Sequence, residues 1–176
     1  MHENYIIPLN GLDREWKKFP WHVGKEFFTD FGNSEIRDCD VQVEAEAAKR
    51  GSRIDIDCHI GGSVVTVCDR CLGDLEMAID TDLHLAVRFG NEPESSPEEE
   101  DGREVVYVGM DSDSIEMDQI IYDYICLSVP LHKVHEDGGC DPEVLKFIKT
   151  DGGSEEKKAA ANNPFSALKG LLDKKL

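Results

Sequence analysis

Much of the first half of the chain alternates apolar and polar residues with a period of two. Between Arg37 and Ala47, the alternating apolar positions are Val41, Val43, Ala45 and Ala47. After a turn at 49–52, the apolar positions are Ile54, Ile56, Cys58 and Ile60. Strands that bury one face and expose the other show this alternation. We therefore predict two half-buried strands joined by a short connection.

Further apolar runs indicate more strands. Pro8 places the first run at a sheet edge, because proline cannot donate to an interior ladder. Gly61–Gly62 predicts a tight turn after the second half-buried strand. Short turns between successive strands favour an antiparallel meander. The additional predicted strands are 5–9, 64–67, 75–89 and 104–108.

The apolar period becomes helical after residue 116. Met117, Ile121, Ile125 and their neighbours recur at helical spacing, which predicts a helix over about Asp118–Ser128 that covers one sheet face and ends at Pro130. The expected fold class is α+β. We predict an antiparallel sheet or meander, partly barrel-like, with one or two packed helices and a C-terminal helical tail.

The length and composition predict one mainly β domain over residues 1–150. Within it, residues 91–103 are rich in proline, serine and acidic side chains, which predicts an acidic loop acting as a solvated insertion or a docking segment. Residues 151–163 have the composition of a flexible linker. Residues 164–176 predict a short helix that would dock on the domain or on a partner. Its apolar stripe is Phe165, Leu168, Leu171 and Leu172.

The net charge of the chain bears on which partners it can bind. The chain has 37 acidic and 19 basic residues, a formal net charge of −18. This charge repels a phosphate backbone and disfavours non-specific RNA binding. It suits either a merely soluble surface or a face that meets basic proteins such as ribosomal proteins. The chain has no apolar run of the ~20 residues that a membrane span needs and no secretory signal, so we expect a cytoplasmic protein without a membrane partner.

Basic and aromatic residues interleave between residues 14 and 25. Trp16, Lys17, Lys18 and Trp21 are therefore candidates for contact with RNA or a protein partner, and we add Arg70 to this set. The alternative for the two tryptophans is that they pack into the core.

The most specific local feature is the pair Cys68 and Cys71. Two thiols separated by two residues in a turn can bind one metal ion, and His135 and Cys140 could complete a structural Cys3His zinc site, with His132 in reserve. A metal-free turn with packed thiols is one alternative. A redox pair is another, although a redox dithiol is expected where a strand meets a helix rather than between two strands.

Motifs for catalysis are not found. The sequence contains no phosphate-binding loop, no G-x-S-x-G elbow and no H-E-x-x-H pair. We therefore expect no enzymatic activity and no small-molecule substrate.

The order of these motifs resembles the YceD family. The C-x-R-C-L element is Cys68–Leu72, and the acidic insertion near Glu98 follows it. Next come the predicted helix, which leads into residues 127–131, the pair His135 and Cys140, and the stretch 163–168. Many members carry two or three cysteines after the proline, whereas here Cys140 stands with histidines. The resemblance implies a cytoplasmic, non-enzymatic factor for synthesis, processing or accumulation of large-subunit (23S) ribosomal RNA. Ribosomal RNA, ribosomal proteins or assembly factors would be its partners. The alternatives are a zinc-stabilised acidic protein-interaction module and a thiol-disulfide protein.

Overall fold

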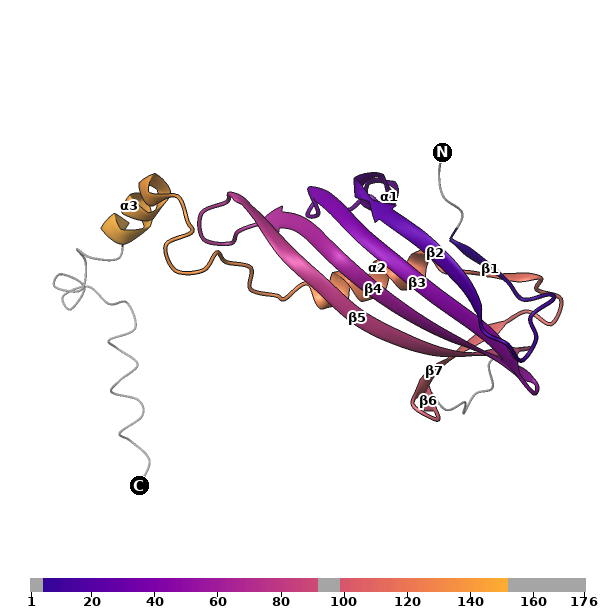
Figure 1. Cartoon of the computed structure of the whole chain (residues 1–176). Coiled ribbons are helices and arrows are strands. Elements are labelled where there is room, and N and C mark those ends of the chain that lie inside the picture. Colours follow the sequence, from indigo (N-terminus) through magenta and orange to yellow (C-terminus); the bar gives the residue numbers. More distant parts are fainter. Residues whose placement is uncertain (1–4, 92–98, 152–176) are drawn as a thin grey trace, which may run out of the picture.

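A computed structural model describes residues 5–91 and 99–151 of the chain (Figure 1). Strands form a six-stranded sheet of order β2-β3-β4-β5-β7-β6 and a two-stranded sheet of β1 and β8. The strands are β1 Ile6–Pro8, β2 Lys17–Gly24, β3 Asp38–Arg50, β4 Arg53–Val67, β5 Asp74–Phe89, β6 Glu99–Glu100, β7 Arg103–Val108 and β8 Ser114–Glu116. The helices are α1 Lys25–Asp30, α2 Asp118–Ser128 and α3 Pro142–Asp151. The predicted α+β class is confirmed.

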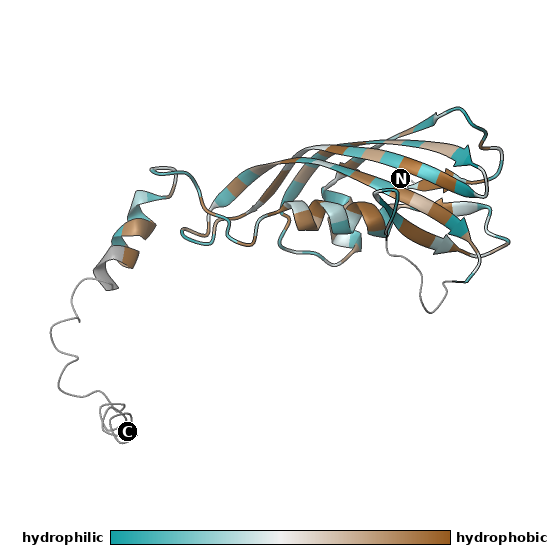
Figure 2. Ribbon diagram, turned by 90° about the horizontal axis from the view of Figure 1, so that it is seen from below, coloured by the Kyte–Doolittle hydropathy of each residue, from teal (hydrophilic) through white to brown (hydrophobic). Residues whose placement is uncertain are grey.

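The apolar face of the long strands lies under α2, which follows one side of the sheet (Figures 1 and 2). Ile121 and Ile125 of α2 are fully buried, as is Met117 just before the helix. They join a core that contains the alternating apolar residues of β3, β4 and β5, together with Phe28 of α1. The helical spacing after residue 116 therefore predicted both the helix and its buried face.

The expectation of a partly barrel-like sheet is wrong. Within the described residues, β2 and β6 lie at opposite ends of the strand order, and the sheet stays open. The physical reason is that α2 and α1 cover the apolar face, so the sheet has no need to wrap around it. From β2 to β5 each strand pairs antiparallel with the next, as a meander does. The pairing of β5 with β7 is parallel, which the sequence pattern did not predict.

The predicted turn at Gly61–Gly62 is also wrong, because both glycines lie inside the continuous strand β4. Gly62 has a φ of +153°, and a Cβ at this position would lie 2.2 Å from the carbonyl oxygen of Asp40 on β3. Gly62 is thus required by the close approach of the neighbouring backbone rather than by a change of chain direction.

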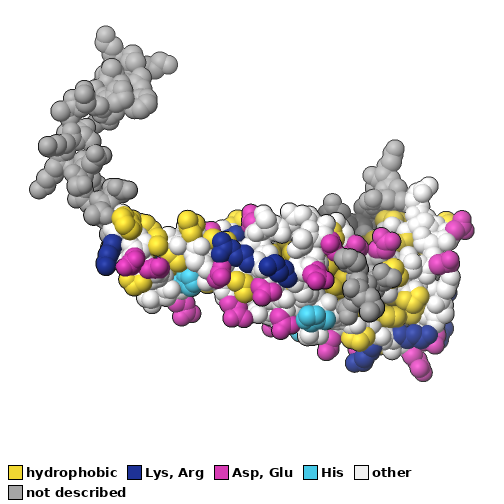
Figure 3. Space-filling model, turned by 90° about the horizontal axis from the view of Figure 1, so that it is seen from above, with side chains coloured by type: hydrophobic (Ala, Val, Ile, Leu, Met, Phe, Trp, Pro, Cys, Tyr) yellow, Lys and Arg dark blue, Asp and Glu magenta, His cyan; other side chains and the backbone are white. Residues whose placement is uncertain are grey.

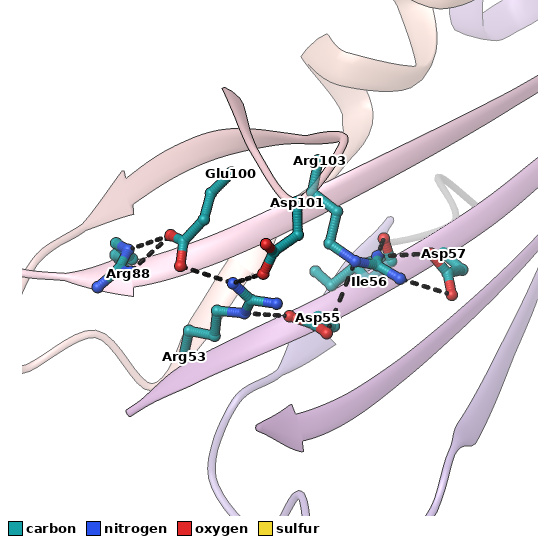
Figure 4. A network of polar contacts seen from close by, with 8 residues as sticks. All are labelled: Arg53, Asp55, Ile56, Asp57, Arg88, Glu100, Asp101 and Arg103. Atoms are coloured by element: carbon teal, nitrogen blue, oxygen red, sulfur yellow. Dashed lines mark hydrogen bonds and ion pairs between the residues drawn. The ribbon is translucent and has the colours of Figure 1, made fainter. Parts of the chain in front are cut away.

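A network of ion pairs holds β6 and the start of β7 against β4 and β5 (Figure 4). Arg53 Nη1 lies 2.7 Å from Glu100 Oε1, and Arg53 Nε lies 2.8 Å from Asp55 Oδ1. Arg103 Nη1 lies 2.6 Å from Asp57 Oδ1. Asp55 is buried, so these pairs also satisfy a carboxylate that has left water. Residues 92–98 of the predicted acidic loop lie outside the described residues. Its last part, Glu99–Arg103, forms the short β6–β7 hairpin.

The helix α3 was not predicted, although its start carries a sequence signal. The Asp141 side chain accepts a hydrogen bond from the Glu143 N–H at 2.8 Å, and Pro142 occupies the first helical position. An aspartate cap followed by proline is typical of a helix N-terminus. The predicted linker beyond residue 151 and the predicted helix at 164–176 lie outside the described residues. Among the helices of the described ranges, none is long and apolar enough to cross a membrane.

Candidate metal centre

The first half of the candidate site is the connection between β4 and β5. The Cys68 N–H donates to the Gly73 carbonyl and the Leu72 N–H donates to the Cys68 carbonyl, both at 2.9 Å. Leu72 takes a left-handed conformation with a φ of 60°. These bonds fold the motif into a compact turn that holds the Cys68 and Cys71 sulfurs at the end of the sheet.

The second half is the connection between α2 and α3. Asp69 binds Lys133 twice: its N–H donates to the Lys133 carbonyl at 2.6 Å, and its carboxylate accepts the Lys133 N–H at 2.7 Å. This exchange fixes the extended segment after Pro130 beside the turn. His135 and Cys140 follow on the same segment and reach the two cysteines of the turn.

The structure brings the four predicted ligands together. The ligand atoms of Cys68, Cys71, His135 and Cys140 all lie within 4.8 Å of one another. Cys68 Sγ lies 3.8 Å from Cys140 Sγ, and His135 Nδ1 lies 3.4 Å from Cys71 Sγ and 3.7 Å from Cys140 Sγ. Tetrahedral zinc with the usual bond lengths separates two sulfurs by about 3.8 Å and a sulfur from a nitrogen by about 3.6 Å. The four side chains therefore have the spacing of a tetrahedral metal site.

The ring of His135 is oriented by a hydrogen bond outside the cluster. Its Nε2 lies 2.9 Å from the main-chain oxygen of Asp74, so this nitrogen carries the proton and donates. Nδ1 is then the acceptor, and it faces the sulfurs. Fixing one ring nitrogen in this way is the common arrangement of metal-binding histidines. The Asp74 carbonyl and the Cys68 sulfur also raise the pKa of His135.

The surroundings of the thiols favour negative charge. Burial opposes ionisation of Cys68, which is fully buried, yet main-chain hydrogen bonds from Cys71, His135 and Arg70 lower its pKa to about 5. A main-chain hydrogen bond from Gly73 lowers the pKa of Cys71. Burial raises the pKa of Cys140, although Arg70 works in the opposite direction. Two of the three sulfurs are thus prepared to act as thiolates, the form that binds metal.

Arg70 is part of this cluster. Its Nε lies 3.0 Å from Cys140 Sγ, and its Nη2 donates to the His135 carbonyl at 2.9 Å. A role of Arg70 in contacting RNA or a partner stays a prediction. The sequence held no signal for the contact with Cys140, because 70 positions separate the two residues.

The reserve ligand His132 lies outside the cluster. Its side chain is 80% exposed, and its Nδ1 is 3.6 Å from Asp69 Oδ2. His132 therefore faces the outer side of the Asp69 turn, whereas His135 faces the sulfurs. Four partly buried apolar residues pack against the three cysteines, namely Leu75, Val134, Val144 and Leu145.

The predicted basic and aromatic patch forms the edge strand β2 and the residue before it. Trp21 is half-buried and packs edge-on against Tyr5, with ring centroids 6.0 Å apart. Trp16 is 37% exposed and lies under the Arg50 guanidinium, 5.1 Å from it. Lys17 donates to the Gly11 carbonyl, and Lys18 pairs with Glu46 at 2.9 Å. The alternation of Phe19, Trp21 and Val23 was the signal for this strand, and it was missed. A role of these residues in binding RNA or a partner stays a prediction.

The solvent face of β3, β4 and β5 gathers carboxylates that sequence reasoning did not connect. The strand register places Glu44, His59 and Asp82 in one row across the three strands. His59 Nδ1 lies 2.8 Å from Asp82 Oδ1, and the hydrogen bond to Asp82 raises the pKa of His59. Figure 3 shows acidic side chains spread along the molecule with histidines among them. We call this surface the acidic sheet face, and its carboxylates include Asp40, Glu44, Glu46, Asp57, Glu76, Asp80 and Asp82.

The fold and the cluster define an α+β protein whose open sheet ends in a group of three cysteines and one histidine. A family model described as "Large ribosomal RNA subunit accumulation protein YceD" matches residues 56–172, about two thirds of the chain, including all four cluster residues. The chain belongs to this family, as the order of its motifs predicted. No curated protein and no solved structure matches the chain.

Proposed function

We propose that this protein is a non-catalytic binding factor that supports accumulation of large-subunit (23S) ribosomal RNA, and that it carries a structural zinc ion at the Cys3His cluster. Membership of the YceD family supports the first part. The spacing of the four ligand atoms supports the second. The cluster joins the β4–β5 connection at the end of the sheet to the α2–α3 connection.

Zinc fits the donor set. Three sulfurs and one imidazole form an accepted structural zinc site, and soft thiolates select zinc over magnesium or calcium. A zinc ion held by Cys68, Cys71, His135 and Cys140 would supply a crosslink between the β4–β5 turn and the α2–α3 connection. These segments bury little apolar surface of their own, because their core is limited to the three cysteines and a few partly buried neighbours.

A structural role agrees better with this geometry than a catalytic one. Four protein ligands complete a tetrahedron and leave no position for a reactive water. The redox alternative gains support from the lowered pKa of Cys68, but Cys68 is fully buried and Cys71 is 7% exposed. Thiol-disulfide exchange needs an accessible thiolate. Burial of both sulfurs therefore favours the metal site.

The acidic sheet face favours a basic protein partner over direct contact with RNA. Its carboxylates would repel phosphates, whereas lysine and arginine side chains of ribosomal proteins would be attracted to them. Glu44, Asp80 and Asp82 are exposed and lie on adjacent rows of the sheet. Such a face could keep the basic segment of a ribosomal protein bound during assembly of the large subunit.

The function is tested by removing the gene and measuring large-subunit ribosomal RNA and its precursors. We expect a reduced level of mature large-subunit RNA relative to small-subunit RNA, restored by the wild-type gene. Normal RNA levels and precursor profiles in the deletion strain would refute the proposed function.

The partner is tested in the same strain with the triple variant Glu44→Lys, Asp80→Lys and Asp82→Lys. We expect this variant to fold, to fail in restoring the RNA level, and to lose ribosomal proteins in affinity purification with quantitative mass spectrometry.

A matched triple variant reverses three exposed carboxylates away from the sheet face, Glu15, Asp111 and Glu116, and should behave as the wild type. Recovery of RNA with unchanged ribosomal proteins in the sheet-face variant would contradict a basic protein partner. Direct crosslinks to RNA in place of protein would do the same.

A further inference from the structure

Arg70 joins the two segments that carry the candidate ligands. It lies on the β4–β5 connection, between Cys68 and Cys71. Both of its acceptors in the cluster, Cys140 Sγ and the His135 carbonyl, belong to the α2–α3 connection. One planar guanidinium therefore holds the two ligands that come from the distant part of the chain.

The two bonds use different donors of the same rigid group. Nε reaches the sulfur at 3.0 Å while Nη2 reaches the carbonyl at 2.9 Å. Arginine can make such a forked contact because its donors are fixed in one plane, whereas the single ammonium of lysine cannot reproduce the geometry. The contact thus depends on the shape of the side chain as well as on its charge.

Charge balance gives a second reason for arginine at this position. With a divalent cation bound, three thiolates, a neutral imidazole and the cation would together carry one negative charge. Arg70 places one positive charge against the sulfur of Cys140, a residue that is only 3% exposed. A buried thiolate without a counter-charge is costly.

We propose that Arg70 is a positioning residue that presents His135 and Cys140 to the candidate metal centre, holding them in place before a metal binds. This inference rests on the proposed metal site only for its effect on metal affinity. The clamp between the two segments consists of protein groups alone, so it acts in the metal-free protein as well.

The first experiment uses the full chain with chelator present throughout. Hydrogen exchange of the backbone amides of residues 133–141 is compared in the wild type, Arg70→Gln and Arg70→Lys, with the amides of β3, β4 and β5 as the internal reference for folding. We expect exchange in 133–141 to rise by about tenfold or more in both variants, as the loss of a charge-assisted hydrogen bond predicts, with the reference unchanged. Arg50→Gln is the matched control. Arg50 ends β3, opposite the start of β4 and away from the turn at Cys68, and it also donates to a main-chain carbonyl, that of Arg14.

The second experiment measures zinc affinity by competition with a chromophoric chelator. We expect zinc to bind about 10- to 100-fold more weakly to Arg70→Gln and Arg70→Lys than to the wild type, the usual effect of losing an outer contact of a metal ligand. Unchanged exchange of residues 133–141 in both Arg70 variants would overturn the clamp, whatever the zinc affinity. A wild type that takes up no zinc, with faster exchange in the Arg70 variants, would refute the metal site and leave the clamp supported.

Discussion

Asp69 and Lys133 exchange two hydrogen bonds across the gap between the β4–β5 turn and the segment after α2. One joins the Asp69 N–H to the Lys133 carbonyl at 2.6 Å, and the other joins the Lys133 N–H to the Asp69 carboxylate at 2.7 Å. The pair makes a short, strand-like contact between segments 64 positions apart. It places His135, two residues later, beside the cysteines of the turn.

Replacing the Asp69 carboxylate should therefore loosen this contact. We expect Asp69→Ala to lower the local opening free energy of residues 131–135 by about 1 kcal/mol, the usual net worth of such a hydrogen bond. Native-state hydrogen exchange measures this change. Asp69→Asn keeps a side-chain oxygen that can accept the Lys133 N–H and should lose less than half as much, about 0.5 kcal/mol at most. Equal losses in the two variants would show that the hydrogen bond from the Lys133 N–H to the side chain of residue 69 does not account for the effect.

The four clustered ligand atoms predict how much zinc the purified protein contains. Protein purified without chelators should contain about one zinc per chain. Cys68→Ser, Cys71→Ser, His135→Ala and Cys140→Ser should each lose most of it, as elemental analysis will show. Cys126→Ser is the control, because Cys126 lies on α2 and outside the cluster. Less than about a tenth of an equivalent in the wild type would exclude the site.

Gly62 should tolerate no side chain. A Cβ would lie 2.2 Å from the Asp40 carbonyl oxygen and 2.7 Å from the Val41 Cα, both parts of the backbone of β3. We expect Gly62→Ala to cost about 3 kcal/mol or more of unfolding free energy in urea titration, because strand pairing must shift. Gly102 also has a positive φ, +74°, but a Cβ added there would have no atom within 4 Å. Gly102→Ala should therefore cost only about 1 kcal/mol of unfolding free energy. Equal costs would mean that backbone conformation alone, rather than the close approach, requires Gly62.

The ion pairs around Asp57 should make stability depend on pH in the acid range. Burial raises the pKa of Asp57, but hydrogen bonds from Arg103 and His84 outweigh it and hold the pKa below its ordinary value of 3.8. A folded-state pKa below the unfolded one means that ionised Asp57 stabilises the fold above about pH 4. This stabilisation is lost as the pH falls through the folded-state pKa.

The pH effect is measured by urea titration of the wild type and Asp57→Asn between pH 7 and pH 3. We expect the variant to be less stable at pH 7 and the difference to shrink below about pH 4. Asp111→Asn removes an exposed carboxylate from the β7–β8 connection and should leave the profile unchanged. A difference between wild type and Asp57→Asn that stays constant with pH would contradict this interpretation.

Local pattern determined a large part of the fold. The period-two alternation in 41–47 and 54–60 predicted the central strands, and the helical spacing from Met117 predicted α2 and its buried face. These predictions succeed because a strand or an amphipathic helix must repeat its buried positions along its own length. The same reasoning misread Gly61–Gly62 as a turn, since a glycine that admits a neighbouring backbone looks the same in sequence as one that reverses the chain.

Residue chemistry also named the four ligand candidates, because thiols and imidazoles are few and the Cys68–Cys71 spacing is distinctive. What only the tertiary structure decided is how they meet. The forked contact of Arg70 with His135 and Cys140 depends on contacts between distant segments. The row of Glu44, His59 and Asp82 depends on strand register. Cys71 and His135 are 64 positions apart. No local periodicity carries information over that distance, whereas the pairing of β4 with β5 and the bonds between Asp69 and Lys133 place these groups within a few ångströms of each other.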